Sequence, residues 1–278
     1  MSFLLLLLAC SPDPACPEGQ VLQDGACVPY QAGDPVPCDD CWHPSPGTTW
    51  QIQYTGALDT GVEVQMFDLD LFDSPDRALS SLHDAGRAVI CYFSAGSYED
   101  WRDDAGDFPA SALGDPLDGW EGEWWLDIRD PMVREIMEAR LDAAVERGCD
   151  GVDPDNVNAY TNDSGFALTA TDQLSYNRFL ADAAHSRGLS VALKNDVEQI
   201  EELEPWFDFQ VNEECASYDE CGLLAPFTGA GKAAFHIEYV DDWEDAEARA
   251  AEVCGVGPNL DTLLKTWELG PEYLACGR

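Results

Sequence analysis

Short apolar runs alternate with amphipathic stretches along most of the chain, from Trp50 to the C-terminus. Such runs are typical of buried strands, and apolar residues at helical spacing between them indicate helices. The alternation predicts βα units and a parallel sheet, which is an α/β fold. The candidate strands are residues 50–54, 62–71, 88–94, 149–153, 190–194, 207–211 and 233–237, with a weaker eighth at 259–263. Seven or eight such units favour a (β/α)8 TIM barrel over an open doubly wound sheet, whose Gly-x-Gly-x-x-Gly signature follows none of these strands.

Two helices have clear ends in the sequence. Asp130 precedes Pro131, a favourable N-cap and first-turn pair, and Gly148 follows the last apolar position of that helix. The second helix is expected to begin at Thr171 and to end at Gly188. Residues 99–125 are too long and too aromatic for a tight turn. Tryptophans on a loop above a barrel mouth can stack on the apolar faces of sugar rings, so we expect at least one of them to contact a sugar. The alternative is that the rings only pack together as a local core.

The N-terminus resembles an export signal. Its apolar run is too short to span a bilayer, and the segment Leu-Leu-Ala-Cys ending at Cys10 resembles a bacterial lipobox. We therefore expect residues 1–9 to be a lipoprotein signal peptide and Cys10 to be lipidated, which tethers a soluble domain. A misassigned start would leave Cys10 without a role. Residues 10–47 are rich in Cys, Pro and Gly and predict a spacer, so that the barrel domain comprises residues 48–278.

Eleven cysteines agree with export to an oxidising compartment. An even number remains if Cys10 carries a lipid. Cys91 and Cys149 lie within predicted strands, where a disulfide and two buried free thiols are equally compatible with the sequence. Local spacing predicts the disulfides Cys16–Cys27, Cys38–Cys41, Cys215–Cys221 and Cys254–Cys276.

The charge of the chain narrows its possible partners. Its 54 acidic and 14 basic residues give a formal net charge of -40. This charge repels nucleic acid and anionic lipid and attracts cations, so we expect no nucleic-acid partner and no membrane contact except through the N-terminal lipid anchor. A cationic substrate and a merely solubilising acidic surface both account for the charge.

Two predicted strands end in acidic residues that can carry chemistry. The predicted strand 149–153 runs directly into Asp155 and Asn156, and the predicted strand 207–211 runs directly into Asn212 and Glu213. The carboxyl ends of the strands form the mouth of a TIM barrel, where its active site lies. Two carboxyls at that mouth are the minimum for glycoside hydrolysis, which makes Asp155 and Glu213 the catalytic candidates. The alternatives are a helix cap at Asp155 and a surface acid beside a disulfide loop at Glu213.

Other residues near strand ends are expected to bind substrate. Lys194 can orient carboxylates, form a Schiff base or pair with Asp153 or Asp155. The four histidines are not grouped, so we expect neither a metal nor another cofactor, and the chain has no Gly-x-Ser-x-Gly motif of a serine hydrolase. The substrate-binding candidates are Asp68, Asp70, Tyr92, Ser94, Trp125, Asp153, Asn156, Lys194, Asn195, Asp196 and Glu238.

Several of these segments resemble glycoside hydrolase family 114, from Trp50 to the C-terminus. The resemblance is carried by residues 50–53, 92–99, 125–128, 151–156, 193–196 and 212–215. It implies a (β/α)8 barrel with endo-α-1,4-polygalactosaminidase activity, with Asp155 and Glu213 as the catalytic carboxylates. It also implies a cationic galactosamine polymer as substrate, for which Asp68, Asp70 and Asp153 would be amine partners.

We expect cleavage with retention, with Asp155 as nucleophile and Glu213 as acid/base. The main alternative is a surface carbohydrate-binding lipoprotein that binds cationic polysaccharide in the same cleft without turnover. A third possibility is an acidic structural or adhesion lipoprotein. The expected location is the bacterial cell envelope or the exterior, and the expected state is a monomer.

Overall fold

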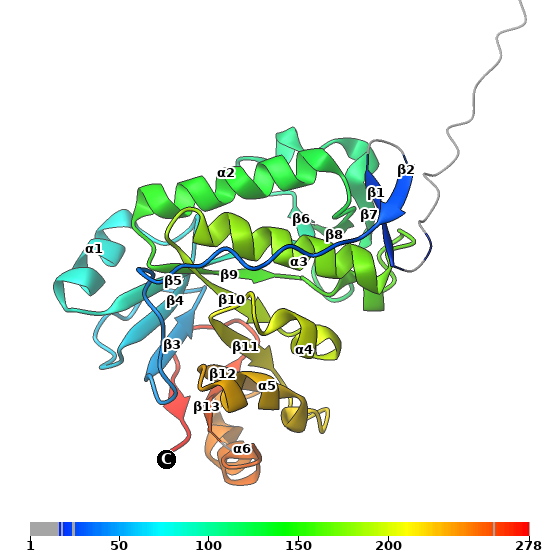
Figure 1. Ribbon diagram of the computed structural model, residues 1–278. Coiled ribbons are helices and arrows are strands. Elements are labelled where there is room, and N and C mark those ends of the chain that lie inside the picture. Colours follow the sequence, from blue (N-terminus) through cyan, green and yellow to red (C-terminus); the bar gives the residue numbers. More distant parts are fainter. Residues whose placement is uncertain (1–16, 18, 24–25, 258, 278) are drawn as a thin grey trace, which may run out of the picture.

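The computed structural model describes residues 17, 19–23, 26–257 and 259–277. Its centre is a nine-stranded sheet with the spatial order β14-β13-β12-β11-β10-β9-β5-β4-β3 (Figure 1). All neighbours are parallel except the pair of β13 with β14. The strands are β3 (Trp50–Gln53), β4 (Met66–Asp70), β5 (Ala88–Ser94), β9 (Gly151–Asp155), β10 (Ser190–Lys194), β11 (Phe209–Glu213), β12 (Ala234–Val240), β13 (Leu260–Thr266) and β14 (Leu274–Ala275). Each of the eight parallel strands overlaps a strand expected from the sequence.

The closed (β/α)8 barrel is not confirmed, because no strand ladder joins β3 to β13 within the described residues. The physical reason is that β14 pairs with β13 and occupies its outer edge. Side chains and loops instead connect β3 to β13. The Trp50 indole Nε1 donates to the Asp261 carbonyl at 2.9 Å, and the Lys265 Nζ donates to Gln51 Oε1 at 3.2 Å. The sheet therefore curls until β3 approaches β13, and individual hydrogen bonds, not a strand ladder, connect the two strands.

The helices lie outside the sheet and follow its strands. They are α1 (Asp76–Asp84), α2 (Pro131–Arg147), α3 (Ala170–His185), α4 (Ile200–Leu203), α5 (Ala225–Ala230) and α6 (Ala246–Val253). Single 3-10 turns lie at Ala105–Asp107, Ala110–Ala112, Ala159–Thr161, Val197–Gln199, Cys221–Leu224 and Trp243–Asp245. In the described part of the chain, no α-helix follows β3 or β13, which is a second departure from the eightfold pattern.

The ends of the two long helices follow local sequence signals. The Asp130 side chain accepts a hydrogen bond from the Met132 amide, and Gly148 ends α2 in the left-handed conformation. Helix α3 begins one residue earlier than expected, because Thr169 forms a reciprocal capping box with Asp172.

A smaller antiparallel sheet stands beside the carboxyl ends of the strands. It consists of β6 (Ser97–Glu99), β8 (Glu123–Leu126) and β7 (Leu113–Pro116), in that order, and is inserted between β5 and α2. Buried arginines fix it to the main sheet. Arg102 Nη2 lies 2.7 Å from Asp70 Oδ2 and 2.8 Å from Glu99 Oε1. We call residues 97–126 the lid segment.

The segment before β3 packs along helix α3, on the outer surface of the domain (Figure 1). After a short hairpin of β1 (Gln20–Gln23) and β2 (Ala26–Pro29), the chain runs in extended form along α3 (Figure 1). The Val36 amide donates to Asp182 Oδ1 at 2.9 Å, and the Val36 carbonyl lies 2.7 Å from His185 Nδ1. This part of the expected spacer is thus attached to the domain. Cys10 lies outside the described residues.

Four disulfides connect described residues: Cys38–Cys41, Cys91–Cys149, Cys215–Cys221 and Cys254–Cys276. Three of them confirm pairs expected from spacing, and Cys91 with Cys149 is a disulfide rather than two free thiols. The expected Cys16–Cys27 pair involves Cys16, which lies outside the described residues. None of the described helices has the length and apolarity needed to cross a membrane.

Candidate active site

A cavity of about 210 Å³ opens at the carboxyl ends of the parallel strands. Strands, strand-end loops and the lid segment all contribute to its wall. The lining residues are Tyr54, Tyr92, Leu117, Trp120, Glu123, Asp155, Asn156, Val157, Asn158, Lys194, Asn195, Glu213, Glu214, Tyr239, Trp267 and Leu269. The cavity therefore lies where a barrel-type sheet carries its active site.

The two catalytic candidates meet at one cation in this cavity. Lys194 Nζ lies 3.4 Å from Asp155 Oδ1 and 3.7 Å from Glu213 Oε1. Those two oxygens are thus at most about 7 Å apart, the sum of the two distances. This bound includes the carboxyl separation of retaining glycosidases, roughly 5–5.5 Å, and only the lower end of the inverting range, roughly 6.5–9.5 Å. Burial opposes the charge on Lys194, but the surrounding carboxylates outweigh it and raise the pKa of the ammonium.

Hydrogen bonds fix the orientation of both carboxylates. The Tyr239 hydroxyl donates to Glu213 Oε1 at 2.6 Å, and Asn195 Nδ2 donates to Glu213 Oε2 at 2.9 Å. Asn195 also accepts from the Glu213 amide at 2.9 Å through its Oδ1, so it binds Glu213 on two sides. The Asn156 amide donates to Asp155 Oδ1 at 2.8 Å. Neither carboxylate is a helix cap or a free surface acid.

The backbone is strained at the strand ends that carry these groups. Asn156, Asn195 and Glu214 have φ angles of 61°, 49° and 59°, a region that residues other than glycine seldom occupy. Such strain tends to gather at functional sites. At Gly96 a Cβ atom would lie only 1.7 Å from the Asn156 carbonyl oxygen, so the turn after β5 packs directly against the loop that follows Asp155.

A buried layer of acids supports Lys194 from below. Asp153 and Asp68 are each 0% exposed, and Asp153 Oδ2 lies 3.7 Å from Lys194 Nζ. Burial raises the pKa of Asp153 to about 7 despite the nearby Lys194. The pKa of Asp68 is raised as well, by burial and by the charge of Asp153. These acids stand behind the cavity wall rather than on it, and the Tyr54 hydroxyl donates to Asp68 Oδ1 at 3.2 Å.

Trp120, a tryptophan of the loop that was expected to contact a sugar, contributes the lid side of the wall. Other residues at the cavity were not among the sequence candidates. Tyr239 and Trp267 stack with ring centroids 4.2 Å apart. Glu123 also lines the cavity, and burial raises the pKa of this carboxyl to about 7 even though the Ser97 hydroxyl donates to it. Period-two alternation is the signal that identifies Tyr239, since it shares the inward face of β12 with Ile237.

Other candidates lie away from the cavity wall. Asp70 is bound to Arg102, and Trp125 is 6% exposed in the lid core. Ser94 is 0% exposed and accepts from Asn156 Nδ2 at 3.0 Å, so it supports the wall from behind. Glu238 points to the outer face of β12, as its alternation with Tyr239 requires. The cavity does contain Tyr92, Asn156, Lys194 and Asn195.

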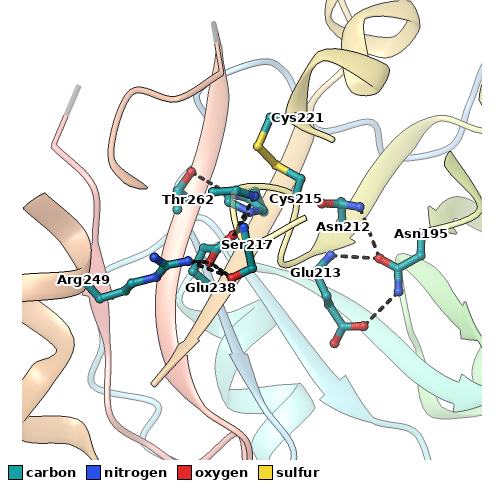
Figure 2. The surroundings of a disulfide bond; sticks show 11 residues. Asn195, Asn212, Glu213, Cys215, Ser217, Cys221, Glu238, Arg249 and Thr262 are labelled. Carbon is teal, nitrogen blue, oxygen red and sulfur yellow. Dashed lines mark hydrogen bonds and ion pairs between the residues drawn. A yellow bond between two sulfur atoms is a disulfide. The ribbon is translucent and has the colours of Figure 1, made fainter. Parts of the chain in front are cut away.

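One cluster has the residue types of a metal site. Ligand atoms of Cys215, Cys221 and His236 lie within 4.8 Å of one another, and all three residues are buried. Figure 2 shows that the two sulfurs are joined to each other. A disulfide sulfur is not a thiolate, and thiolates are the cysteine form that binds metals. The donor set therefore does not fit a metal ion.

The sequence profile described as glycoside-hydrolase family GH114 matches residues 35–278. This chain belongs to glycoside hydrolase family 114. Aspergillus fumigatus Ega3, whose crystal structure is a complex with galactosamine, is 44% identical to this family member. The match covers 88% of this chain and 100% of Ega3, with a TM-score of 0.83. The chain is accordingly a glycoside hydrolase.

A more distant comparison supports the fold alone. The glycoside hydrolase domain of PelA from Pseudomonas aeruginosa is 15% identical, and the match covers 82% of this chain and 98% of that domain with a TM-score of 0.65. A comparison with curated proteins gives no match.

Proposed function

We propose that this protein is an exported endo-acting glycoside hydrolase that cleaves α-1,4-linked galactosamine polymers with Asp155 and Glu213. The observation that carries the proposal is the meeting of these two carboxylates at Lys194 Nζ within one cavity. Two carboxyls on opposite sides of a glycosidic bond are the usual equipment for this reaction.

The proposed mechanism retains the configuration of the sugar. Asp155 attacks the anomeric carbon, and Glu213 gives its proton to the departing glycosidic oxygen. In the second step Glu213 takes a proton from water, which then displaces Asp155 from the sugar. Lys194 holds the two side chains in place. Its positive charge also stabilises Glu213 after that residue has given up its proton, and Asp155 when it leaves the sugar.

The proposed substrate rests on two kinds of support. The cavity wall combines four carboxylates with aromatic rings, which suits a sugar that carries a positive charge. The similar Ega3 has been crystallised with galactosamine. Among the sequence candidates, Tyr92, Asn156 and Asn195 are proposed to contact the substrate, and Asp153 and Asp68 to act through Lys194.

The proposed cellular context follows from the N-terminal sequence and the disulfides. Residues 1–9 are proposed as a signal peptide, Cys10 as the site of a lipid anchor and residues 48–278 as the catalytic domain, acting as a monomer. Disulfides form and persist in oxidising compartments, and four of them connect described residues. Metabolic labelling with a palmitate analogue tests the anchor, since a Cys10→Ser variant should lose the label.

A reducing-end assay on the purified protein tests the reaction. The substrates are deacetylated galactosaminan, chitosan and pectin, and the variants are Asp155→Asn and Glu213→Gln. We expect cleavage of galactosaminan alone and loss of at least about a thousandfold in each variant, because each removes a group that acts in the transition state.

Two results would contradict parts of the proposal. Tight binding of intact polymer without new reducing ends would favour a carbohydrate-binding protein. Inverted product in an NMR time course, with no trapped glycosyl-enzyme, would refute retention and the nucleophilic role of Asp155.

A further inference from the structure

Glu123 lines the cavity together with Asp155 but has no part in the proposed mechanism. It belongs to β8 of the lid segment and is 6% exposed. The Ser97 hydroxyl donates to its Oε2 at 2.6 Å, while its Oε1 has no hydrogen bond within the described part of the chain. Burial raises the pKa of Glu123 to about 7, and Oε1 is free to hold the proton. Oε2 is therefore an acceptor for Ser97 in both protonation states.

Ser97 connects Glu123 to a series of hydrogen bonds. Its hydroxyl has one hydrogen, which it gives to Glu123, so Ser97 Oγ only accepts from its other neighbours. The Ser94 hydroxyl, 2.6 Å away, therefore donates to Ser97. Asn156 Nδ2 donates to Ser94 Oγ at 3.0 Å and to Ser97 Oγ at 3.2 Å, so both of its hydrogens are bound. We call these four residues the lid network. The direction of each bond in it follows from the acceptor that Glu123 provides.

Asn156 is the member of the lid network that orients Asp155. Its backbone amide donates to Asp155 Oδ1 at 2.8 Å. Its φ angle of 61° lies in a region that residues other than glycine seldom occupy, and such a conformation persists only where the surrounding structure fixes it. The two hydrogen bonds from its side chain supply part of that support. Without them, Asn156 would be free to turn its amide away from Asp155.

The turn after β5 holds the same place in the chain from the backbone side. The amides of Ala95 and Gly96 donate to the Asp155 carbonyl at 2.8 and 3.0 Å. The Gly96 carbonyl in turn accepts from the amide of Leu126, which lies on β8 like Glu123, at 2.9 Å. The lid segment and the end of β9 are therefore joined by both backbone and side-chain bonds.

We propose that Glu123 is a positioning residue for Asp155. It acts through Ser97 and Asn156, and the lid network holds the Asp155 carboxylate in the orientation for attack on the sugar. The proposal rests on the proposed function, since it assigns a support to the nucleophile named there. The role needs the acceptor at Oε2 and not the charge, so Glu123→Gln preserves it and Glu123→Leu abolishes it.

Steady-state kinetics on galactosaminan compare these two changes. We expect Glu123→Leu to lower kcat by about 10- to 100-fold with little change in KM, because the orientation of Asp155 matters in the transition state. Glu123→Gln should keep kcat close to that of the parent. Ser97→Ala breaks the lid network at the next residue and provides a smaller change where Glu123→Leu does not fold. The double variant Ser97→Ala/Glu123→Leu should be no slower than the slower single variant, since both break one network.

Glu121→Leu is the matched control. Glu121 is exposed, belongs to the same lid segment and does not line the cavity. The control makes the same exchange of a carboxylate for an apolar side chain, and kcat should not change. Equal kcat values for Glu123→Leu and Glu121→Leu would overturn the positioning role. A Glu123→Gln variant as slow as Glu123→Leu would also overturn it, because the carboxyl of Glu123 would then take part in the reaction itself.

Hydrogen exchange at the Asn156 side chain separates this proposal from the proposed function, because it needs no turnover. Nitrogen-15 NMR follows the exchange of the two Nδ2 hydrogens with water, and their signals are assigned by their absence in Asn156→Asp. We expect exchange at least about tenfold faster in Glu123→Leu than in the parent or Glu123→Gln. Faster exchange in Glu123→Leu, with no cleavage by the parent, would refute the function and leave the lid network standing. Cleavage by the parent, with unchanged exchange in Glu123→Leu, would refute the lid network and leave the function standing.

Discussion

Replacing Lys194 with methionine should be the most damaging single change near the cavity that leaves both catalytic candidates in place. Lys194 is 2% exposed, and its Nζ lies 3.4 to 3.7 Å from carboxylate oxygens of Asp153, Asp155 and Glu213. Methionine fills most of the same space without the charge. The three carboxylates would then face one another without a cation.

The magnitude follows from these distances. At an effective dielectric constant of about 20, each contact contributes roughly 4.5 to 5 kcal/mol of attraction before the cost of taking the charges out of water. Because that cost cancels much of the attraction, removing one partner of a buried ion pair typically lowers the free energy of unfolding by about 3–5 kcal/mol. We expect a loss of this size at pH 7, with activity below detection.

The loss of unfolding free energy in Lys194→Met should grow as the pH rises. Without the cation, the pKa of Asp153 rises further above its value in the unfolded chain, so the folded state binds more protons. Stability of the variant then falls as pH rises between about 4 and 8. The defect measured at pH 5 should therefore be smaller than the defect at pH 7.

Urea unfolding at both pH values measures these effects. Lys232→Met is the matched control, since Lys232 is partly exposed and pairs with Glu204 at 2.7 Å, while its Nζ also donates to the backbone carbonyls of Glu204 and Phe207. That change should cost about 1–2 kcal/mol with little dependence on pH. A Lys194→Met/Asp153→Asn double variant should recover part of the loss, because one buried carboxylate is gone. Equal losses for the two lysine variants, or a Lys194→Met loss that is the same at pH 5 and pH 7, would refute the reasoning.

Three further predictions concern the surroundings of the site. Tyr239→Phe removes the 2.6 Å hydrogen bond to Glu213 and should lower kcat by roughly 10- to 100-fold with little change in KM, since such bonds to charged groups contribute about 1.5–3 kcal/mol; steady-state kinetics decide this, and an unchanged kcat contradicts it. Gly96→Ala places a Cβ atom 1.7 Å from the Asn156 carbonyl oxygen and should destabilise the fold by at least about 1–3 kcal/mol, measured as a lower Tm. Burial opposes ionisation of Glu238, but hydrogen bonds from a histidine, an arginine and a serine lower its pKa to about 2. Its contribution to stability is therefore present above about pH 4.5 and lost as pH falls towards 2, so acid titration of Glu238→Gln should show a smaller loss over that range than the parent does.

The sequence predicted those parts of the fold that depend on short-range patterns. Each parallel strand is a run of apolar residues with its own local boundaries, and Gly148 ends α2 where the helical spacing stops. Local spacing likewise indicated Cys215–Cys221, whose two residues are close in the chain. The arrival of Asp155 and Glu213 at one cavity follows from their places at strand ends, because parallel strands bring those ends together.

The rest depends on contacts between residues far apart in the chain. Whether the sheet closes is decided by the pairing of β14 with β13, and a two-residue strand has no pattern of its own. The sequence alone did not distinguish the buried Asp70, which pairs with Arg102 from the lid segment, from a substrate-binding acid. Trp267 and Glu123 join the cavity only because a late loop and an inserted sheet fold over it. The alternating strands and their terminal acids were thus determined by the sequence itself. Which acids reach the substrate was decided by the tertiary structure, because burial and ion pairing depend on distant partners.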